Sequence, residues 1–130
     1  MDQGPLVREQ IDAGRQFLTE FEKQIPVQAA FWLKQGEEGR WDLYVASDQI
    51  DDQTIKVAYR EVLRVAGQMR DPNFGPFQVK AIGIDDPFAQ AALDVLRRYP
   101  GRVAAHFHNR IFGGVGVEEV YIYPSPIPVS

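Results

Sequence analysis

The chain lacks cysteine, so neither disulfide bonds nor thiolate metal ligands are available to its 130 residues. It also lacks a long apolar run, since the longest stretches are only a few residues and too short to span a bilayer. The first ten residues, MDQGPLVREQ, include an early acid and no apolar segment, which is not typical of a secretory signal. These absences predict a cytoplasmic protein with no membrane partner.

Signatures of common catalytic sites are missing as well. The glycine-rich stretch Gly113–Gly116 is followed by an alternating strand pattern rather than a helix, and no GKS or GKT is present, so we expect a hairpin turn and not a phosphate loop. Serine occurs only as Ser47, Ser125 and Ser130, with no GxSxG. No cofactor is expected, and enzymatic activity is uncertain, with the balance against it.

The composition is that of an ordinary globular protein, with 45% hydrophobic and 25% charged residues. Its length fits one domain, which we place at residues 1–123, followed by an extended, proline-spaced C-terminal tail at 124–130. The net charge is −4, and residues 1–50 hold nine acids against five Lys and Arg. This acidity argues against nucleic acid as the main partner.

The spacing of apolar residues predicts the secondary structure. Positions repeating every three or four residues indicate helices, and alternating positions indicate strands. The strand over 77–84 turns apolar on both faces toward its end, as a central strand would. In chain order the prediction is a helix over about 5–24, strands over 27–34 and 40–47, a helix over about 52–69 capped by Asp51, a strand over 77–84, a helix after Asp85 or Asp86 that stops at Pro100, and a hairpin over 102–123.

The resulting order, α-β-β-α-β-α-β-β, predicts an α+β fold. If the strand order runs steadily across the sheet, right-handed crossovers put the helices on one side. The favoured arrangement is therefore a two-layer sandwich, a five-stranded mixed sheet with three helices packed on one face. If the order reverses in mid-sheet, the helices cover both faces and the fold has three layers.

In the two-layer form one sheet face stays uncovered, and the polar and aromatic residues of both hairpins would lie on it. Large amphipathic side chains of this kind often anchor interfaces. The predicted binding residues are Trp32, Arg40, Tyr44, His106, His108, Arg110, Glu119, Tyr121 and Tyr123.

The two histidines of the chain, His106 and His108, are spaced to lie on one strand face, where both could bind one divalent ion with Glu119 as a third ligand. The simpler interpretation is that they are solvated surface residues, and no metal is expected.

The acids Asp48, Asp51, Asp52, Asp85 and Asp86 lie where strands pass into helices, and helix capping is favoured over magnesium binding for them.

These patterns favour a protein-interaction module whose outer sheet face binds another protein or a second copy of itself, giving a homodimer. One alternative is a single-stranded nucleic-acid binder that stacks bases on the same aromatics and contacts phosphates through Lys34, Arg40 and Arg110. A second is a small enzyme that uses His106 or His108 as acid or base beside Glu119 or Asp42.

Overall fold

The computed structural model describes residues 6, 8–35, 40–101 and 103–124, and of Gln35 the backbone only. The residues between the strands expected at 27–34 and 40–47, and the tail expected at 124–130, lie outside this part of the chain, apart from Gln35 and Pro124. The elements are α1 (Arg8–Phe21), β1 (Ala29–Gln35), β2 (Arg40–Ser47), α2 (Ile55–Met69), a 3₁₀ turn η1 (Pro76–Gln78), β3 (Val79–Gly83), α3 (Pro87–Arg98), β4 (Ala105–Phe112) and β5 (Val115–Ile122).

The five strands form one mixed sheet in the order β3-β2-β1-β5-β4. The β2–β3 pair is parallel, and the other three pairs are antiparallel. The predicted α+β class, the element order, the three helices and the five-stranded mixed sheet are confirmed. The central position expected for the strand over 77–84 is wrong, because β3 lies at an edge.

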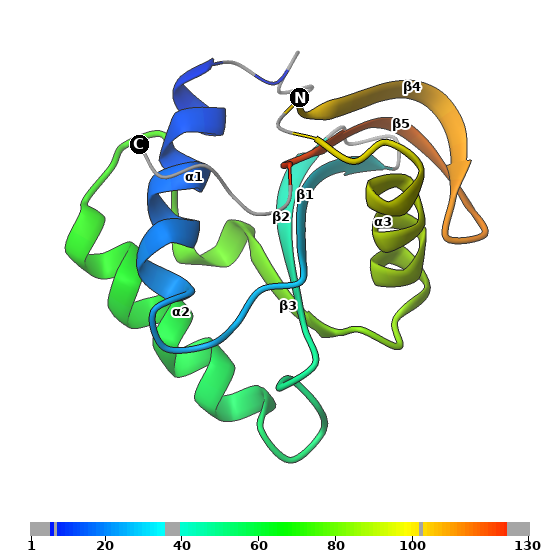
Figure 1. Cartoon of the computed structure of the whole chain (residues 1–130). Coiled ribbons are helices and arrows are strands. Elements are labelled where there is room, and N and C mark those ends of the chain that lie inside the picture. The colour runs from blue at the N-terminus through cyan, green and yellow to red at the C-terminus, as the bar shows by residue number, and fades with distance from the viewer. Residues whose placement is uncertain (1–5, 7, 36–39, 102, 125–130) are drawn as a thin grey trace.

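The helices cover both faces of the sheet, so the expected placement of all three on one face is wrong. Figure 1 shows α1 and α2 on one side of the sheet and α3 on the other. One core cluster joins Trp32 and Leu43 to side chains of α1 and α2, whereas a second joins Phe31 and Val120 to those of α3. The apolar residues on both faces of β3 therefore reflect two covering layers rather than a central position.

The strand order explains why α3 lies apart. The chain moves from β1 through β2 to the β3 edge, then crosses the whole sheet to β4 at the opposite edge. Following the pair directions across the sheet, β3 and β4 are antiparallel. The handedness rule for parallel crossovers thus constrains α2 between β2 and β3 but not α3. This is the reversed order that the sequence left open, with helices on both faces.

A close approach fixes α1 on the sheet. The indole nitrogen of Trp32 donates to the hydroxyl of Tyr123 at 2.8 Å, and that hydroxyl donates to the Ile11 carbonyl of α1 at 2.7 Å. Gly14 of α1 lies directly above this pair, since a Cβ there would come within 2.3 Å of the Tyr123 hydroxyl. The glycine in the apolar stripe of this helix therefore permits contact between helix backbone and sheet.

The predicted helix capping is found at the start of α3 but not at the start of α2. The Asp86 carboxylate accepts from the Phe88 amide at 2.8 Å and caps α3, as predicted. The Asp51 carboxylate instead accepts from the amides of Gln53 and Thr54, in the turn before α2 begins at Ile55. Within the described ranges, no helix has the length and apolar character needed to cross a membrane.

Candidate functional site

Two of the predicted binding residues cannot contact a partner. Trp32 and Tyr123 are fully buried beneath α1, and burial raises the pKa of the Tyr123 hydroxyl. The prediction that these aromatic side chains are exposed on an outer sheet face is therefore wrong for Trp32 and Tyr123. The stacking platform that a nucleic-acid binder would need is covered by the chain's own helix.

The first hairpin also divides its predicted residues between the two faces. Trp32 pairs with Leu43, whereas Tyr44 pairs with Phe31, and directly opposed residues point to the same side of a sheet. Tyr44 consequently lies on the α3 side, half-buried, with its ring stacked on Phe31 at 5.3 Å between centroids. Arg40 is exposed, and its Nε lies 3.5 Å from Asp42 Oδ1.

The second hairpin keeps its predicted residues together. His106 pairs with Tyr121 and His108 pairs with Glu119, so all four side chains share the sheet face that carries α1. Because β4 is an edge strand, its two imidazoles remain in solvent, with 42% of the His106 side chain and 62% of the His108 side chain exposed. Glu119, one strand further in, retains only 13% exposure.

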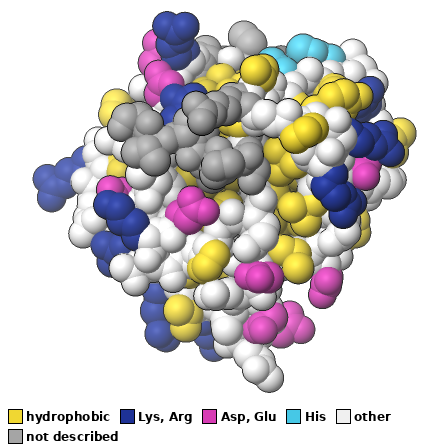
Figure 2. Space-filling view, viewed as in Figure 1, with side chains coloured by type: hydrophobic (Ala, Val, Ile, Leu, Met, Phe, Trp, Pro, Cys, Tyr) yellow, Lys and Arg dark blue, Asp and Glu magenta, His cyan; other side chains and the backbone are white. Residues whose placement is uncertain are grey.

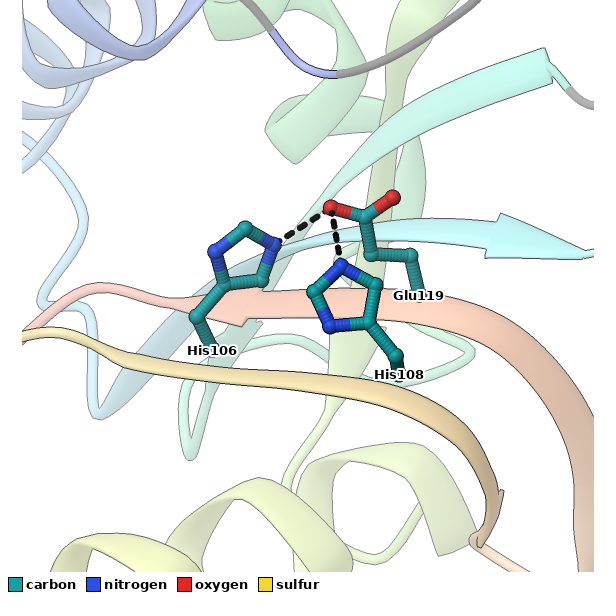
Figure 3. Close-up of side chains that lie close together, drawn as sticks. All are labelled: His106, His108 and Glu119. Atoms are coloured by element: carbon teal, nitrogen blue, oxygen red, sulfur yellow. Dashed lines mark hydrogen bonds and ion pairs between the residues drawn. The ribbon is translucent and has the colours of Figure 1, made fainter.

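These side chains converge on one atom. Figure 3 shows both imidazoles, from β4, directed at the same carboxylate oxygen of Glu119 on β5. The Nε2 of His106 contacts Glu119 Oε2, and the Nε2 of His108 lies 3.3 Å from it. The ligand atoms of the three residues all lie within 4.8 Å of one another. We call these three residues, His106, His108 and Glu119, the His–Glu cluster.

Tyr121 forms the inner wall of the His–Glu cluster. Its ring packs edge-to-face against His106 at 5.7 Å and against Tyr123 at 5.3 Å, which links the cluster to the buried contact beneath α1. Burial raises the pKa of the half-buried Tyr121, and the nearby Arg15 of α1 opposes that shift.

Asp42 is on β2 and on the opposite sheet face, so only Glu119 can serve as the carboxylate partner in an acid–base interpretation.

Arg110 lies apart from the cluster, contrary to the sequence prediction. Asn109 has a φ of 49°, and after this residue the alternation of β4 shifts by one. The guanidinium of Arg110 consequently stacks over the ring of Phe107 at 4.2 Å, on the α3 side. Sequence alternation gives no sign of such a shift, although Asn is the non-glycine residue most suited to this conformation.

Residues along the outer edge of β4 were missed as a group by the sequence interpretation. Val103 and Ile111 are 84% and 72% exposed, and Tyr99 is exposed near Val103. A pocket of about 330 Å³ lies at the start of β4; its lining residues include Tyr99, Pro100, Val103 and Phe107. Figure 2 shows apolar side chains gathered on the side of the molecule that carries α3 and β4, with the histidines at its rim.

Four of the five aspartates named from the sequence, all but Asp48, line a second depression between the start of α2 and the end of β3. Asp86 accepts the Phe88 amide and confirms the capping prediction for α3, whereas Asp51 accepts the Gln53 and Thr54 amides in the turn before α2 and does not cap that helix. No family model, no curated protein and no solved structure matches the chain.

Proposed function

We propose that the chain is a protein-interaction module that pairs with a second copy of itself along the free edge of β4. The observation that supports this most is the position of β4, which among the described residues has a strand partner, β5, on one side only. An edge strand presents unpaired backbone N–H and C=O groups, and these bind an added strand readily.

Edge strands in monomeric proteins are often shortened or protected by lysine and proline. The eight-residue β4, AHFHNRIF, contains neither, and four consecutive residues, His108–Ile111, are exposed. Its main irregularity is the positive φ of Asn109, which leaves the stretch before it regular. The apolar pocket lies beside that regular stretch and could receive a side chain of the added strand.

A second copy fits this edge by symmetry. Two antiparallel copies of one strand meet across a two-fold axis, and each then contributes the same residues. Val103 and Ile111 flank Phe107 at equal sequence distance, so pairing centred on Phe107 brings the Val103 end of one copy beside the Ile111 end of the other. Both side chains are among the most exposed apolar groups described, and the pairing would remove them from water.

The test is the mass in solution, measured by light scattering after size exclusion. We expect about twice 14.7 kDa at concentrations on the order of 10 µM. The double variant Val103→Lys, Ile111→Lys should weaken dimerisation at least about tenfold, because buried charges oppose edge pairing. Leu63→Lys, on an exposed position of α2, is the matched control and should leave the dimer unchanged. A wild-type monomer at about 100 µM would overturn the proposal.

A further inference from the structure

We infer that the His–Glu cluster is a binding site for a divalent transition-metal ion of the zinc class. The inference goes beyond the proposed function and does not depend on it, since the cluster occupies the sheet face and not the edge of β4. It differs from the favoured sequence interpretation of solvated histidines, because the structure directs both imidazoles at one carboxylate oxygen of Glu119.

The geometry is close to that of a metal site. Zinc bonds of about 2.0–2.1 Å in a tetrahedral arrangement separate neighbouring ligand atoms by about 3.3 Å. His108 Nε2 and Glu119 Oε2 are already 3.3 Å apart. The remaining separations among the three ligand atoms lie within 4.8 Å, so small side-chain rotations would bring all three to the spacing of a zinc site.

The scaffold holds these ligands in place. Two imidazoles at positions i and i+2 of a strand project from the same face, and the directly paired residue of the next strand meets them there. The ring centroids of His106 and His108 are 4.8 Å apart, and Tyr121 supports His106 from within. A site built on paired strands loses less conformational freedom on binding than one built on loops.

Charge points to the same occupant. The Glu119 carboxylate is largely shielded from water and contacts both histidines, and Lys34 of β1 is its direct cross-strand neighbour on the other side. In their neutral form these imidazoles offer lone pairs and no positive charge. A metal ion would supply that charge and accept a lone pair from each imidazole Nε2, with the ring proton on Nδ1.

The donor set selects the metal. Two imidazole nitrogens and one carboxylate oxygen suit zinc and its neighbours in the first transition row, whereas magnesium and calcium prefer oxygen ligands alone. Three protein ligands leave a fourth position, and the exposure of both histidines opens it to water.

Competition with a chromogenic chelator at pH 7.5 measures the affinity of the full chain for zinc. We expect one zinc ion per chain with a Kd of about 1 µM or tighter, and no binding of magnesium or calcium at about 1 mM. His106→Ala, His108→Ala and Glu119→Gln should each weaken zinc binding at least about tenfold. Glu118→Gln is the matched control, because this neighbouring acid lies on the same strand beside Lys34 and outside the cluster.

A second measurement locates the ion directly. Zinc should shift the imidazole ¹⁵N signals of both histidines together, at one equivalent, in the wild type and in the Val103→Lys, Ile111→Lys variant. A wild-type Kd weaker than about 100 µM, or equal affinities in Glu119→Gln and Glu118→Gln, would overturn the inference. Retention of zinc by the double variant His106→Ala, His108→Ala would do so as well.

Discussion

The two hairpins of this protein look alike in sequence and differ in how far the helices cover them. Both alternate apolar residues with a set of polar and aromatic ones. The β1–β2 hairpin lies near the middle of the sheet, covered by α1 on one face and α3 on the other. The β4–β5 hairpin ends at the sheet edge formed by β4, and the two histidines of β4 stay exposed to solvent. Alternation thus shows which residues share a strand face, while the strand order decides whether that face is covered.

The largest expected difference between the hairpins is in stability. Trp32→Ala should lower the free energy of unfolding by about 3–5 kcal/mol, because it opens a cavity beneath α1. His108→Ala, in the exposed cluster, should change it by no more than about 0.5 kcal/mol in the absence of metal. Urea unfolding followed by circular dichroism measures both. A large loss in His108→Ala would show that the two hairpins are equally integrated in the core.

Two helix glycines test how closely α1 packs on the first hairpin. Gly14→Ala should destabilise by about 1–3 kcal/mol, because the new methyl group would overlap the Tyr123 hydroxyl. Gly67→Ala, in α2 with open space around it, should stabilise by about 0.5–1 kcal/mol through helix propensity. Thermal unfolding of the two variants distinguishes the effects by sign. If the Gly14→Ala variant were more stable than the wild type, α1 would not be in close contact with the sheet at this position.

A smaller effect is expected at the irregular residue of the second hairpin. Asn109→Ala should cost about 1 kcal/mol, because alanine adopts positive φ less readily than asparagine. Asn109→Gly should be neutral or slightly stabilising, since glycine has no such penalty. Unfolding in urea compares the two. Equal stability of the alanine and glycine variants would argue against the shift in alternation at this position.

The smallest effect concerns Asp42 of the first hairpin and depends on pH. Burial raises the pKa of Asp42, while Arg40 and Lys80 partly offset that shift. A raised folded-state pKa means that the folded protein binds the proton more tightly than the unfolded chain. The carboxylate therefore destabilises the fold at neutral pH, and this penalty disappears as the pH falls through the raised pKa toward the unfolded value of about 3.9.

Asp42→Asn should accordingly stabilise the protein at pH 7 and have less effect near pH 4. Asp51→Asn is the control of opposite sign, because backbone hydrogen bonds from Gln53 and Thr54 lower the pKa of Asp51. Its carboxylate stabilises the fold above the unfolded pKa, and that contribution is lost as the pH falls. Urea unfolding between pH 4 and 7 should show the two variants diverging at the neutral end.

The elements and the His–Glu cluster could be predicted from sequence because both depend on local periodicity. His106, His108, Glu119 and Tyr121 were assigned to one face correctly, since a short glycine turn leaves little freedom in the register of β4 and β5. Trp32 and Tyr44 were assigned to one face wrongly. The longer connection between β1 and β2 allows alternative registers, and a shift of one residue reverses every side chain.

The covering of the sheet could not be predicted from such patterns. It depends on β5 inserting beside β1, a pairing between distant segments that no local period records. Had Gly14 been taken as a sign of close approach, a helix above Trp32 would have been the natural expectation. A glycine inside the apolar stripe of a helix costs stability unless something needs the space.

The pairing of β1 with β5 also has a consequence for the order of folding. The hydroxyl of Tyr123 and the carbonyl of Ile11 are 112 residues apart, yet they meet beneath α1. A chain emerging from the ribosome can form α1, β1, β2 and α2 early, but β1 keeps an open edge until the last strand arrives. Contacts of such long range slow folding, and the open edge is exposed to neighbouring chains during that interval. We therefore expect a fragment ending before β4 to aggregate where the full chain folds.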